Sequence, residues 1–126
     1  MLGSSALVGF VPTLDFEASR PFYRDVLGLK LIAEDPFAMT FSANGTSLRV
    51  TKTPEFTPQP FTVLGWWVDD VEAKVDALLA AGVSTERYDM LEQDDKGLWA
   101  PPGARVKVAW FKDPDGNTLS VTGFVG

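Results

Sequence analysis

The chain has 126 residues, of which 45% are apolar and 12% aromatic, enough for one compact domain with a hydrophobic core. It contains no cysteine, which excludes disulfides and thiolate chemistry, and no histidine, which removes the commonest general base and metal ligand. Its net charge of −6 disfavours nucleic acids and anionic membranes as partners. No apolar run approaches the ~20 residues that span a bilayer, and no basic segment precedes an apolar run at the N-terminus, so we expect a cytoplasmic protein.

The first half of the chain predicts one helix among four strands. Asp15 can cap a helix over residues 16–27, whose apolar side chains at Ala18, Phe22, Val26 and Leu27 share a helical spacing. Pro21 fits such a helix only in or near its first turn. Asn44-Gly45 is a strong hairpin signal. Strands are predicted over residues 7–13, 30–34, 37–42 and 47–52.

The second half repeats this plan after a linker over residues 54–60, which holds three prolines and cannot lie in a central strand. Asp69 or Asp70 can cap the second helix, and Gly82 closes it. Its expected buried residues are Val71, Val75, Leu78 and Leu79. Strands are predicted over residues 61–68, 84–88, 106–112 and 118–123.

A long loop separates two of these strands, at residues 90–104. Loops of this length in a compact domain are usually functional lids or disordered, and the embedded Trp99 favours a lid. Asp94 and Asp95 read most simply as a solvated part of this loop. For a cationic ligand they would be counter-charges near the binding site.

Two short motifs occur twice. Gly45-Thr46-Ser47-Leu48-Arg49-Val50 resembles Gly116-Asn117-Thr118-Leu119-Ser120-Val121, so that Arg49 corresponds to Ser120. Asp15-Phe16-Glu17-Ala18 recurs as Asp70-Val71-Glu72-Ala73 at the start of each predicted helix. The chain is therefore predicted to be a single domain (1–126) built from two copies of one module, at residues 7–53 and 61–126.

Three segments together resemble the vicinal oxygen chelate superfamily, which includes glyoxalase I, extradiol dioxygenases, fosfomycin-resistance enzymes and bleomycin-binding proteins. They are Pro21-Phe22-Tyr23-Arg24-Asp25-Val26-Leu27-Gly28-Leu29, Trp67-Val68-Asp69-Asp70-Val71-Glu72-Ala73 and Phe111-Lys112-Asp113-Pro114-Asp115-Gly116-Asn117. The resemblance implies an α+β fold of two βαβββ modules, whose mixed sheet forms a cup with the helices outside. It also implies a small ligand held in the cup and a homodimer.

Metal-dependent members of this superfamily place their ligands at four inward positions, which the resemblance assigns here to Val8, Arg49, Val63 and Ser120. The internal repeat gives the same pairing, Val8 with Val63 and Arg49 with Ser120. Valine has no donor atom, arginine repels a cation, and one serine hydroxyl is a poor substitute for a carboxylate. We therefore expect no metal and no cofactor, which puts the metal-based activities of the family in doubt.

The inward positions instead describe an apolar, aromatic site for an organic ligand. Arg49 lies either at the mouth of the cup or inside, where it could bind a carboxylate or phenolate. On burial statistics, valines on strands such as Val8 and Val63 are more often core residues than ligand contacts, and Trp67 and Trp99 could be rim or interface residues. Trp66 should face the helices, and the register of Trp110 stays open. The predicted ligand-binding residues are Val8, Phe10, Arg49, Phe61, Val63, Trp67, Tyr88, Trp99 and Ser120.

The aspartates of the last turn, Asp113 and Asp115, with Asn117, alternate as in a calcium loop, but no bidentate Glu follows, so we predict a self-capped hairpin turn. Two functions remain. The first is a metal-free protein that binds an aromatic or amphipathic small molecule. The second is an enzyme of the same superfamily, of the lyase, isomerase or dioxygenase type, with an unrecognised metal site or with acid-base chemistry at a residue such as Glu34, Glu86, Tyr88 or Asp89. No catalytic residue is assigned.

Overall fold

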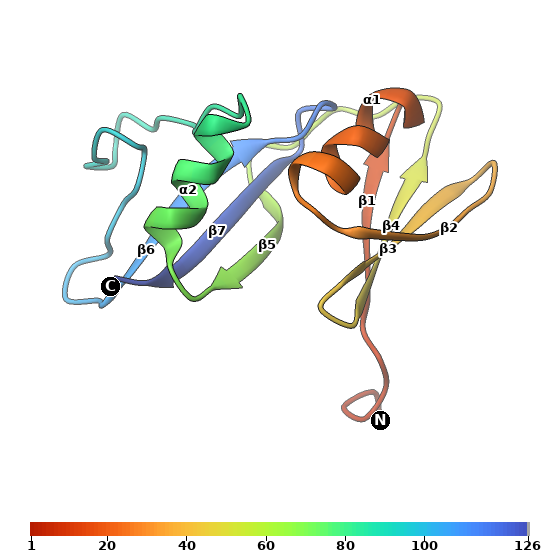
Figure 1. Cartoon of the computed structure of the whole chain (residues 1–126), viewed down its shortest axis with the longest axis horizontal. Coiled ribbons are helices and arrows are strands. Elements are labelled where there is room, and N and C mark those ends of the chain that lie inside the picture. The colour runs from red at the N-terminus through yellow and green to blue at the C-terminus, as the bar shows by residue number, and fades with distance from the viewer. Residues whose placement is uncertain (126) are drawn as a thin grey trace. The chain divides into compact units, whose positions relative to one another are not determined.

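The computed structural model describes residues 1–125, in two compact units that divide after Thr57. The fold is α+β, as predicted: the first unit holds a four-stranded sheet and the second a three-stranded sheet, each with one helical segment (Figure 1). Among residues 1–125, no helix has both the length and the apolar character needed to cross a membrane.

The sheet of the first unit has the strand order β1-β4-β3-β2. β1 and β4 are parallel, whereas the other two pairs are antiparallel. Asn44 and Gly45 both have positive φ (51° and 87°), so they form the predicted tight turn between β3 and β4. The strands are β1 (Val8–Thr13), β2 (Lys30–Glu34), β3 (Ala38–Ala43) and β4 (Thr46–Lys52).

The helical segment of the first unit starts as predicted but continues differently. The Asp15 side chain accepts a hydrogen bond from Glu17 N (2.9 Å) and caps α1 (Phe16–Pro21). Pro21 is the last residue of α1 and not part of its first turn, which corrects the sequence prediction. Because proline lacks an N–H and crowds the preceding turn, the helix widens after it into the π-helix η1 (Phe22–Val26).

The buried side chains of this helical segment differ in part from those expected. Tyr23 is fully buried and contacts the Phe41 ring (5.9 Å between centroids), while the expected core residues Ala18 and Val26 are exposed. Ser19 is buried too, because its hydroxyl accepts a hydrogen bond from the Thr13 hydroxyl (3.0 Å). Phe22 is buried as the helical spacing predicts, whereas the predictions for Ala18, before Pro21, and Val26, after it, are wrong.

The sheet of the second unit has the order β5-β7-β6, with β5 and β7 parallel and β6 and β7 antiparallel. The helix α2 lies across β6 and β7 and is capped by Asp70, whose carboxylate accepts a hydrogen bond from Ala73 N (Figure 1). Leu79, expected in the buried stripe, is exposed. The elements are β5 (Thr62–Val68), α2 (Val71–Ala80), β6 (Val106–Lys112) and β7 (Thr118–Phe124).

The strand predicted over residues 84–88 does not form. Only Thr85 makes an isolated bridge, to Phe111. The Gln93 side chain accepts a hydrogen bond from Tyr88 N (2.7 Å) and donates one to Glu86 O (2.8 Å). Because a side-chain amide occupies these backbone groups, they are not available for a β-ladder, and the second βαβββ module has one strand fewer than predicted.

The internal repeat is visible in the two cores. Leu48 lies opposite Phe41 on β4 and β3, and Leu119 lies opposite Phe111 on β7 and β6. All four side chains are at most 3% exposed. The repeated Gly-x-Ser/Thr-Leu-x-Val motif therefore places the same Leu–Phe pair in the core of each unit.

The turn between β6 and β7 caps its own backbone, as predicted. The buried Asp113 carboxylate accepts hydrogen bonds from Asp115 N (3.0 Å), Asn117 N (2.9 Å) and Asn117 Nδ2 (2.9 Å). We expect Asp113→Ala to lower the free energy of unfolding by about 2 kcal/mol, because it leaves buried N–H groups without an acceptor. Urea denaturation would measure this loss. An unchanged midpoint would contradict the structural role of the carboxylate.

Candidate functional site

The face of the second sheet opposite α2 carries a row of side chains that crosses all its strands. Trp67 on β5 lies opposite Thr122 on β7, which lies opposite Val108 on β6. Val108 in turn forms a bridge with Trp99, through Trp99 N to Val108 O and Val108 N to Trp99 O (both 2.9 Å). Because directly paired residues share a face, two tryptophans stand at the two ends of this row. We call this side of the sheet the open face.

A second row beside it explains the register of Trp110. Ser120 on β7 lies opposite Gly65 on one side and Trp110 on the other. Trp110 is therefore on the open face. Trp66 pairs with Val121 and alternates to the side of α2, as predicted.

Ring contacts divide the aromatic residues of the open face into two groups. Trp67 meets Phe124 edge to face, with centroids 5.0 Å apart. Trp110 meets Tyr88 edge to face (5.3 Å) and contacts Trp99 at 6.1 Å. Such edge-to-face pairs hold rings in fixed orientations. The open face thus presents two preformed aromatic groups.

Small side chains lie between the two groups. A Cβ on Gly65 would lie 2.6 Å from the Ser120 hydroxyl oxygen, so glycine at this position leaves room for Ser120. Ser120, Thr122 and Val108 complete the strip. Aromatic walls around a strip of small and hydroxyl-bearing residues are typical of sites for flat organic molecules.

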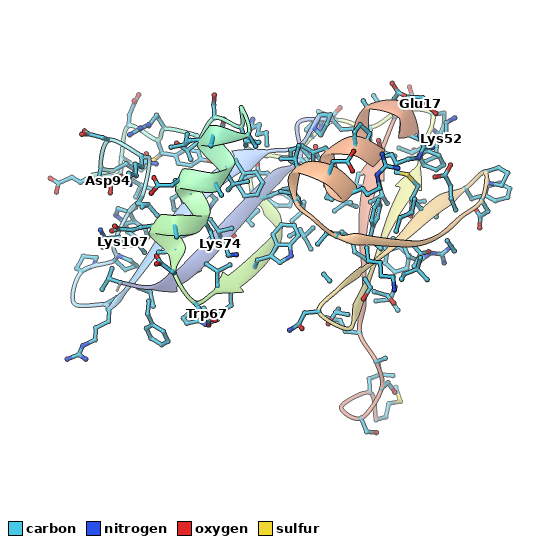
Figure 2. All side chains as sticks on the ribbon, viewed as in Figure 1. Glu17, Lys52, Trp67, Lys74, Asp94 and Lys107 are labelled. Atoms are coloured by element: carbon cyan, nitrogen blue, oxygen red, sulfur yellow. The ribbon has the colours of Figure 1, made fainter. Side chains whose placement is uncertain are left out.

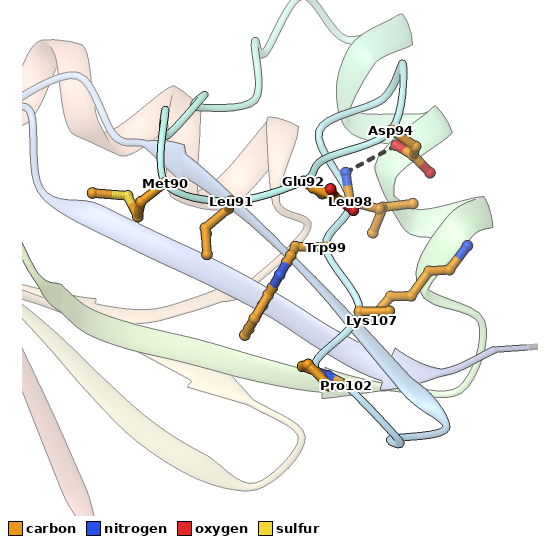
Figure 3. Close-up of a pocket in the computed structure, with 9 residues that line it drawn as sticks. Met90, Leu91, Glu92, Asp94, Leu98, Trp99, Pro102 and Lys107 are labelled. Atoms are coloured by element: carbon orange, nitrogen blue, oxygen red, sulfur yellow. Dashed lines mark hydrogen bonds between the residues drawn. The ribbon is translucent and has the colours of Figure 1, made fainter.

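A separate pocket of about 570 Å³ lies at the edge of the same unit, under the loop of residues 90–102 (Figure 3). Trp99 lines it as well as contacting Trp110. Lys107 lines the opposite side, but its amine is paired with Glu72 on α2 (2.8 Å). The remaining lining residues are Met90, Leu91, Glu92, Asp94, Leu98, Ala100 and Pro102.

The loop itself is held by hydrogen bonds to its own residues and to the segment before it. The Asp94 carboxylate accepts hydrogen bonds from Lys96 N (2.9 Å) and Leu98 N (3.0 Å). Arg87 donates to the carbonyl oxygens of Asp94 and Asp95. Figure 2 shows Asp94 and Lys107 on the loop side of this unit and Trp67 at the end of β5. Asp94 therefore acts first as a turn cap, and its role as a counter-charge for a ligand stays a prediction.

In the first unit, the sheet face opposite the core carries the other predicted residues. Phe10 lies opposite Arg49, and Val8 lies two residues before Phe10 on the same face. Val8 and Phe10 are exposed by 42% and 61%, so neither is a core residue. The Arg49 guanidinium carbon lies 6.0 Å from the centre of the Phe10 ring, at the range of a cation–π contact.

Phe61 and Val63 lie at the start of β5, where the strand register defines their positions less clearly than those of Val8 and Phe10. Phe61 precedes the strand and is 58% exposed, and the register of β5 against β7 shifts between Thr62 and Leu64, next to Val63. Gly65, two residues after Val63, pairs with Ser120, as Phe10, two residues after Val8, pairs with Arg49. The strand register thus agrees with the equivalence of Val8 with Val63 and of Arg49 with Ser120.

The four positions at which the resemblance would place a metal do not fit one. In the first unit Arg49 presents a cation beside the alkyl side chain of Val8, and in the second Ser120 offers one hydroxyl near Val63. Divalent metal ions in proteins require several donor groups, either carboxylate and carbonyl oxygens for hard cations or imidazole and carboxylate for transition metals. Within residues 1–125 no group of three or more Asp, Glu, His or Cys side chains gathers at a common point.

Two of the four acid-base candidates, Glu34 and Tyr88, have pKa shifts that oppose general-base catalysis. Glu34 forms a two-point ion pair with Arg20 (2.8 and 2.7 Å), whose hydrogen bonds lower the pKa of the Glu34 carboxyl. Burial raises the pKa of the Tyr88 phenol, with a smaller contribution from the charge of Glu86. A general base at neutral pH needs a carboxylate pKa raised toward neutrality or a phenol pKa lowered toward it, so these shifts have the wrong sign.

The lowered pKa of Glu34 makes a prediction for stability. A carboxyl whose pKa is depressed in the folded state stabilises the fold above its unfolded pKa, and this contribution is lost as the pH falls through the folded pKa. We therefore expect Glu34→Gln to be less stable than the wild type at neutral pH and equally stable in acid. Urea denaturation across this range measures the difference, and a constant difference at every pH would rule out the ion pair as its cause.

Sequence reasoning missed several residues of the open face. Phe124 lies beyond the predicted end of the last strand, at residue 123, yet its ring contacts Trp67. Gly65 and Val108 carry no chemical signal in the sequence, and only the strand register shows that they lie beside Ser120 and Thr122. Gly65 could have been predicted, because side chains alternate along a strand and Gly65 therefore lies on the same face as Trp67.

No curated protein sequence matches the chain. Its structure resembles TnmS3, an antibiotic binding protein from Streptomyces sp. CB03234, with 26% identity, 98% coverage of each chain and a TM-score of 0.74. It also resembles the fosfomycin resistance protein FosX from Listeria monocytogenes (11% identity, 95% of this chain and 93% of that chain, TM-score 0.75). A third match is a lactoylglutathione lyase from Agrobacterium tumefaciens (18% identity, 95% of this chain and 93% of that chain, TM-score 0.73).

The last two likenesses show the fold alone, because proteins with this fold differ widely in activity. The sequence match is more specific and covers almost the whole chain. Residues 7–121 match the Glyoxalase/Bleomycin resistance protein/Dioxygenase superfamily, and the chain belongs to this family.

Proposed function

We propose that this chain is a metal-free small-molecule-binding protein of the glyoxalase/bleomycin-resistance type, which holds an aromatic or amphipathic ligand. The observation that carries the proposal is the open face of the second sheet, where two groups of ring-contacting aromatic side chains flank a strip of small residues. Apolar walls with a few placed hydroxyls are typical of sites for organic ligands.

The proposed ligand contacts are grouped by unit. In the first unit they are Val8, Phe10 and Arg49. In the second unit they are Phe61, Val63, Trp67, Tyr88, Trp99 and Ser120, to which the strand register adds Trp110 and Phe124. The likeness to an antibiotic binding protein supports this class of function. The proposal also takes the chain to be cytoplasmic, as its lack of a membrane-spanning apolar run suggests, and to be a homodimer, as the family resemblance implies.

The enzyme alternative has less support. None of the four metal positions carries a carboxylate or an imidazole, and the pKa shifts of Glu34 and Tyr88 oppose general-base catalysis. The Glu86 carboxylate forms an ion pair with the Lys112 amine (3.7 Å between Oε1 and Nζ), and both side chains are partly exposed to solvent. Binding without chemical conversion requires none of these groups.

The proposal can be tested with three probes that share one ring system: 2-naphthamide, 2-naphthoate and 2-naphthylmethylammonium. All four tryptophans belong to the second unit, so their emission reports on that unit alone. We expect at least one probe to change the tryptophan emission in a saturable way and to raise the thermal midpoint, since a ligand that binds only the folded state stabilises it. The absence of both effects with all three probes would contradict the proposal.

A further inference from the structure

We infer that the first unit binds an aromatic ligand with an anionic group, a carboxylate or phenolate, and that Arg49 binds this group. The inference rests on the proposed function. It adds the charge of the ligand and the residue that binds the charged group. It starts from the position of Arg49 in the middle of β4, between β1 and β3, on the sheet face that also carries the exposed Phe10.

Arg49 lacks the partners that an arginine in a sheet normally has. Its Nε atom is buried and makes no hydrogen bond, and no ion pair within residues 1–125 includes this side chain. A buried donor without an acceptor costs free energy, so such a group is usually satisfied by a ligand, an ion or water. Acidic residues outnumber basic ones by 17 to 11, so potential ion-pair partners are plentiful, yet Arg49 has none among the residues that the structure describes.

The surroundings of Arg49 favour a small anion with hydrogen-bonding capacity. Thr40 lies directly opposite it on β3, and Thr51 lies two residues further along β4 on the same face. The Thr51 hydroxyl is also buried without a partner. One guanidinium with unsatisfied N–H capacity beside a hydroxyl is a donor set that matches carboxylate and phenolate oxygens.

The charge of Arg49 affects the carboxylate of Asp35, but this carboxylate already accepts two backbone hydrogen bonds. The pKa of Asp35 is lowered first by its hydrogen bonds from Phe37 N and Ala38 N, and only last by the charge of Arg49. Its Oδ1 atom accepts both backbone hydrogen bonds, at 2.7 and 2.9 Å. Asp35 therefore serves as a turn cap and leaves Arg49 without a counter-ion.

The position of Phe10 beside Arg49 supports an aromatic ligand. A guanidinium that lies over a ring keeps its N–H groups in its own plane, where they can still donate to an anion. The Phe10 ring is 61% exposed and offers an apolar surface next to the charge. An apolar surface beside a cation matches an aromatic molecule with an acidic substituent.

The test compares 2-naphthoate with 2-naphthamide, which differ in charge but hardly in shape. We expect the wild type to bind 2-naphthoate about tenfold or more tightly than 2-naphthamide by isothermal titration calorimetry, as for a charge-assisted hydrogen bond. Arg49→Met should remove this preference, so that the variant binds the two probes with affinities within about twofold of each other. Arg49→Lys should keep part of the preference, because it retains the charge but not the planar fork.

Arg105→Met is the matched control, since it removes one positive charge from an exposed position of the other unit and should leave the preference unchanged. Circular dichroism and thermal midpoints show whether each variant folds. If the wild type binds 2-naphthamide equally well or better, or if 2-naphthylmethylammonium binds best, the inference is wrong while the proposed function stands. If none of the three probes binds, both are wrong.

Discussion

Replacing Trp67 and Trp110 together by alanine should weaken the binding of 2-naphthamide by about 2 kcal/mol or more, roughly 30-fold. The two side chains lie on the open face and belong to different ring groups, Trp67 with Phe124 and Trp110 with Tyr88 and Trp99. Each should contribute about 1 to 3 kcal/mol as an apolar wall, and the losses should add because the two residues have no shared ring partner. Calorimetric titration of the single and double variants measures these losses.

Trp66→Phe is the control for this experiment. Trp66 neighbours Trp67 in the chain but pairs with Val121 on the side of α2, so it should leave the affinity unchanged. The metal content should be the same in all variants. If the Trp66 variant loses as much affinity as the double variant, the ligand does not bind the open face.

Replacing Phe111 by alanine should lower the free energy of unfolding by about 3 to 5 kcal/mol, and the equivalent change at Phe41 should cost a similar amount. Both rings are fully buried, and each lies opposite the leucine of the repeated motif, Leu119 or Leu48. Truncation removes the apolar contacts and leaves a cavity that a close-packed core fills only in part. Chemical denaturation measures both losses.

Hydrogen exchange adds a test of the two-unit description. Phe111→Ala should lower the protection of amides in β6 and β7, and Phe41→Ala that of amides in β3 and β4. The matched control is Val63→Ala, at an exposed position of β5, which should change stability by less than about 0.5 kcal/mol. Equal losses at the exposed and the buried positions would contradict the core assignment.

Much of the fold follows from local signals in the sequence. β2 and β6 have the predicted bounds, and the Asn44-Gly45 turn and both aspartate caps form as expected, since each depends on a few neighbouring residues. The repeat of Leu48 as Leu119 was also readable, because it reflects the same core position in each unit.

Where the predictions fail, a local backbone constraint or a competing side-chain hydrogen bond decides the structure. The helix after Pro21 widens into η1, which a fixed helical period does not predict. Residues 84–88 have the composition of a strand, but the Gln93 side chain, five residues beyond this segment, takes two of the backbone groups that a strand would use. Sequence patterns do not show such side-chain competition.

The sequence indicates that the candidate site lacks metal ligands, but it does not show which aromatic residues lie together. The absence of histidine and the identities of Val8, Arg49, Val63 and Ser120 argue from the sequence against the metal centre of the family. The grouping of Trp110 with Tyr88 and Trp99 needed the pairing of β6 with β7 and the bridge at Trp99, which no single strand pattern contains.

The measurement that tests the account most directly is a calorimetric titration of the probe that binds most tightly, on protein treated with EDTA and on protein incubated with Zn²⁺, Mn²⁺, Ni²⁺ or Fe²⁺. The account predicts the same affinity and stoichiometry in every sample, because the proposed contacts are aromatic rings, hydroxyls and one guanidinium. Binding that disappears after EDTA treatment and returns with one of the metals would contradict a metal-free binding protein and would favour a metal-dependent enzyme of the same family.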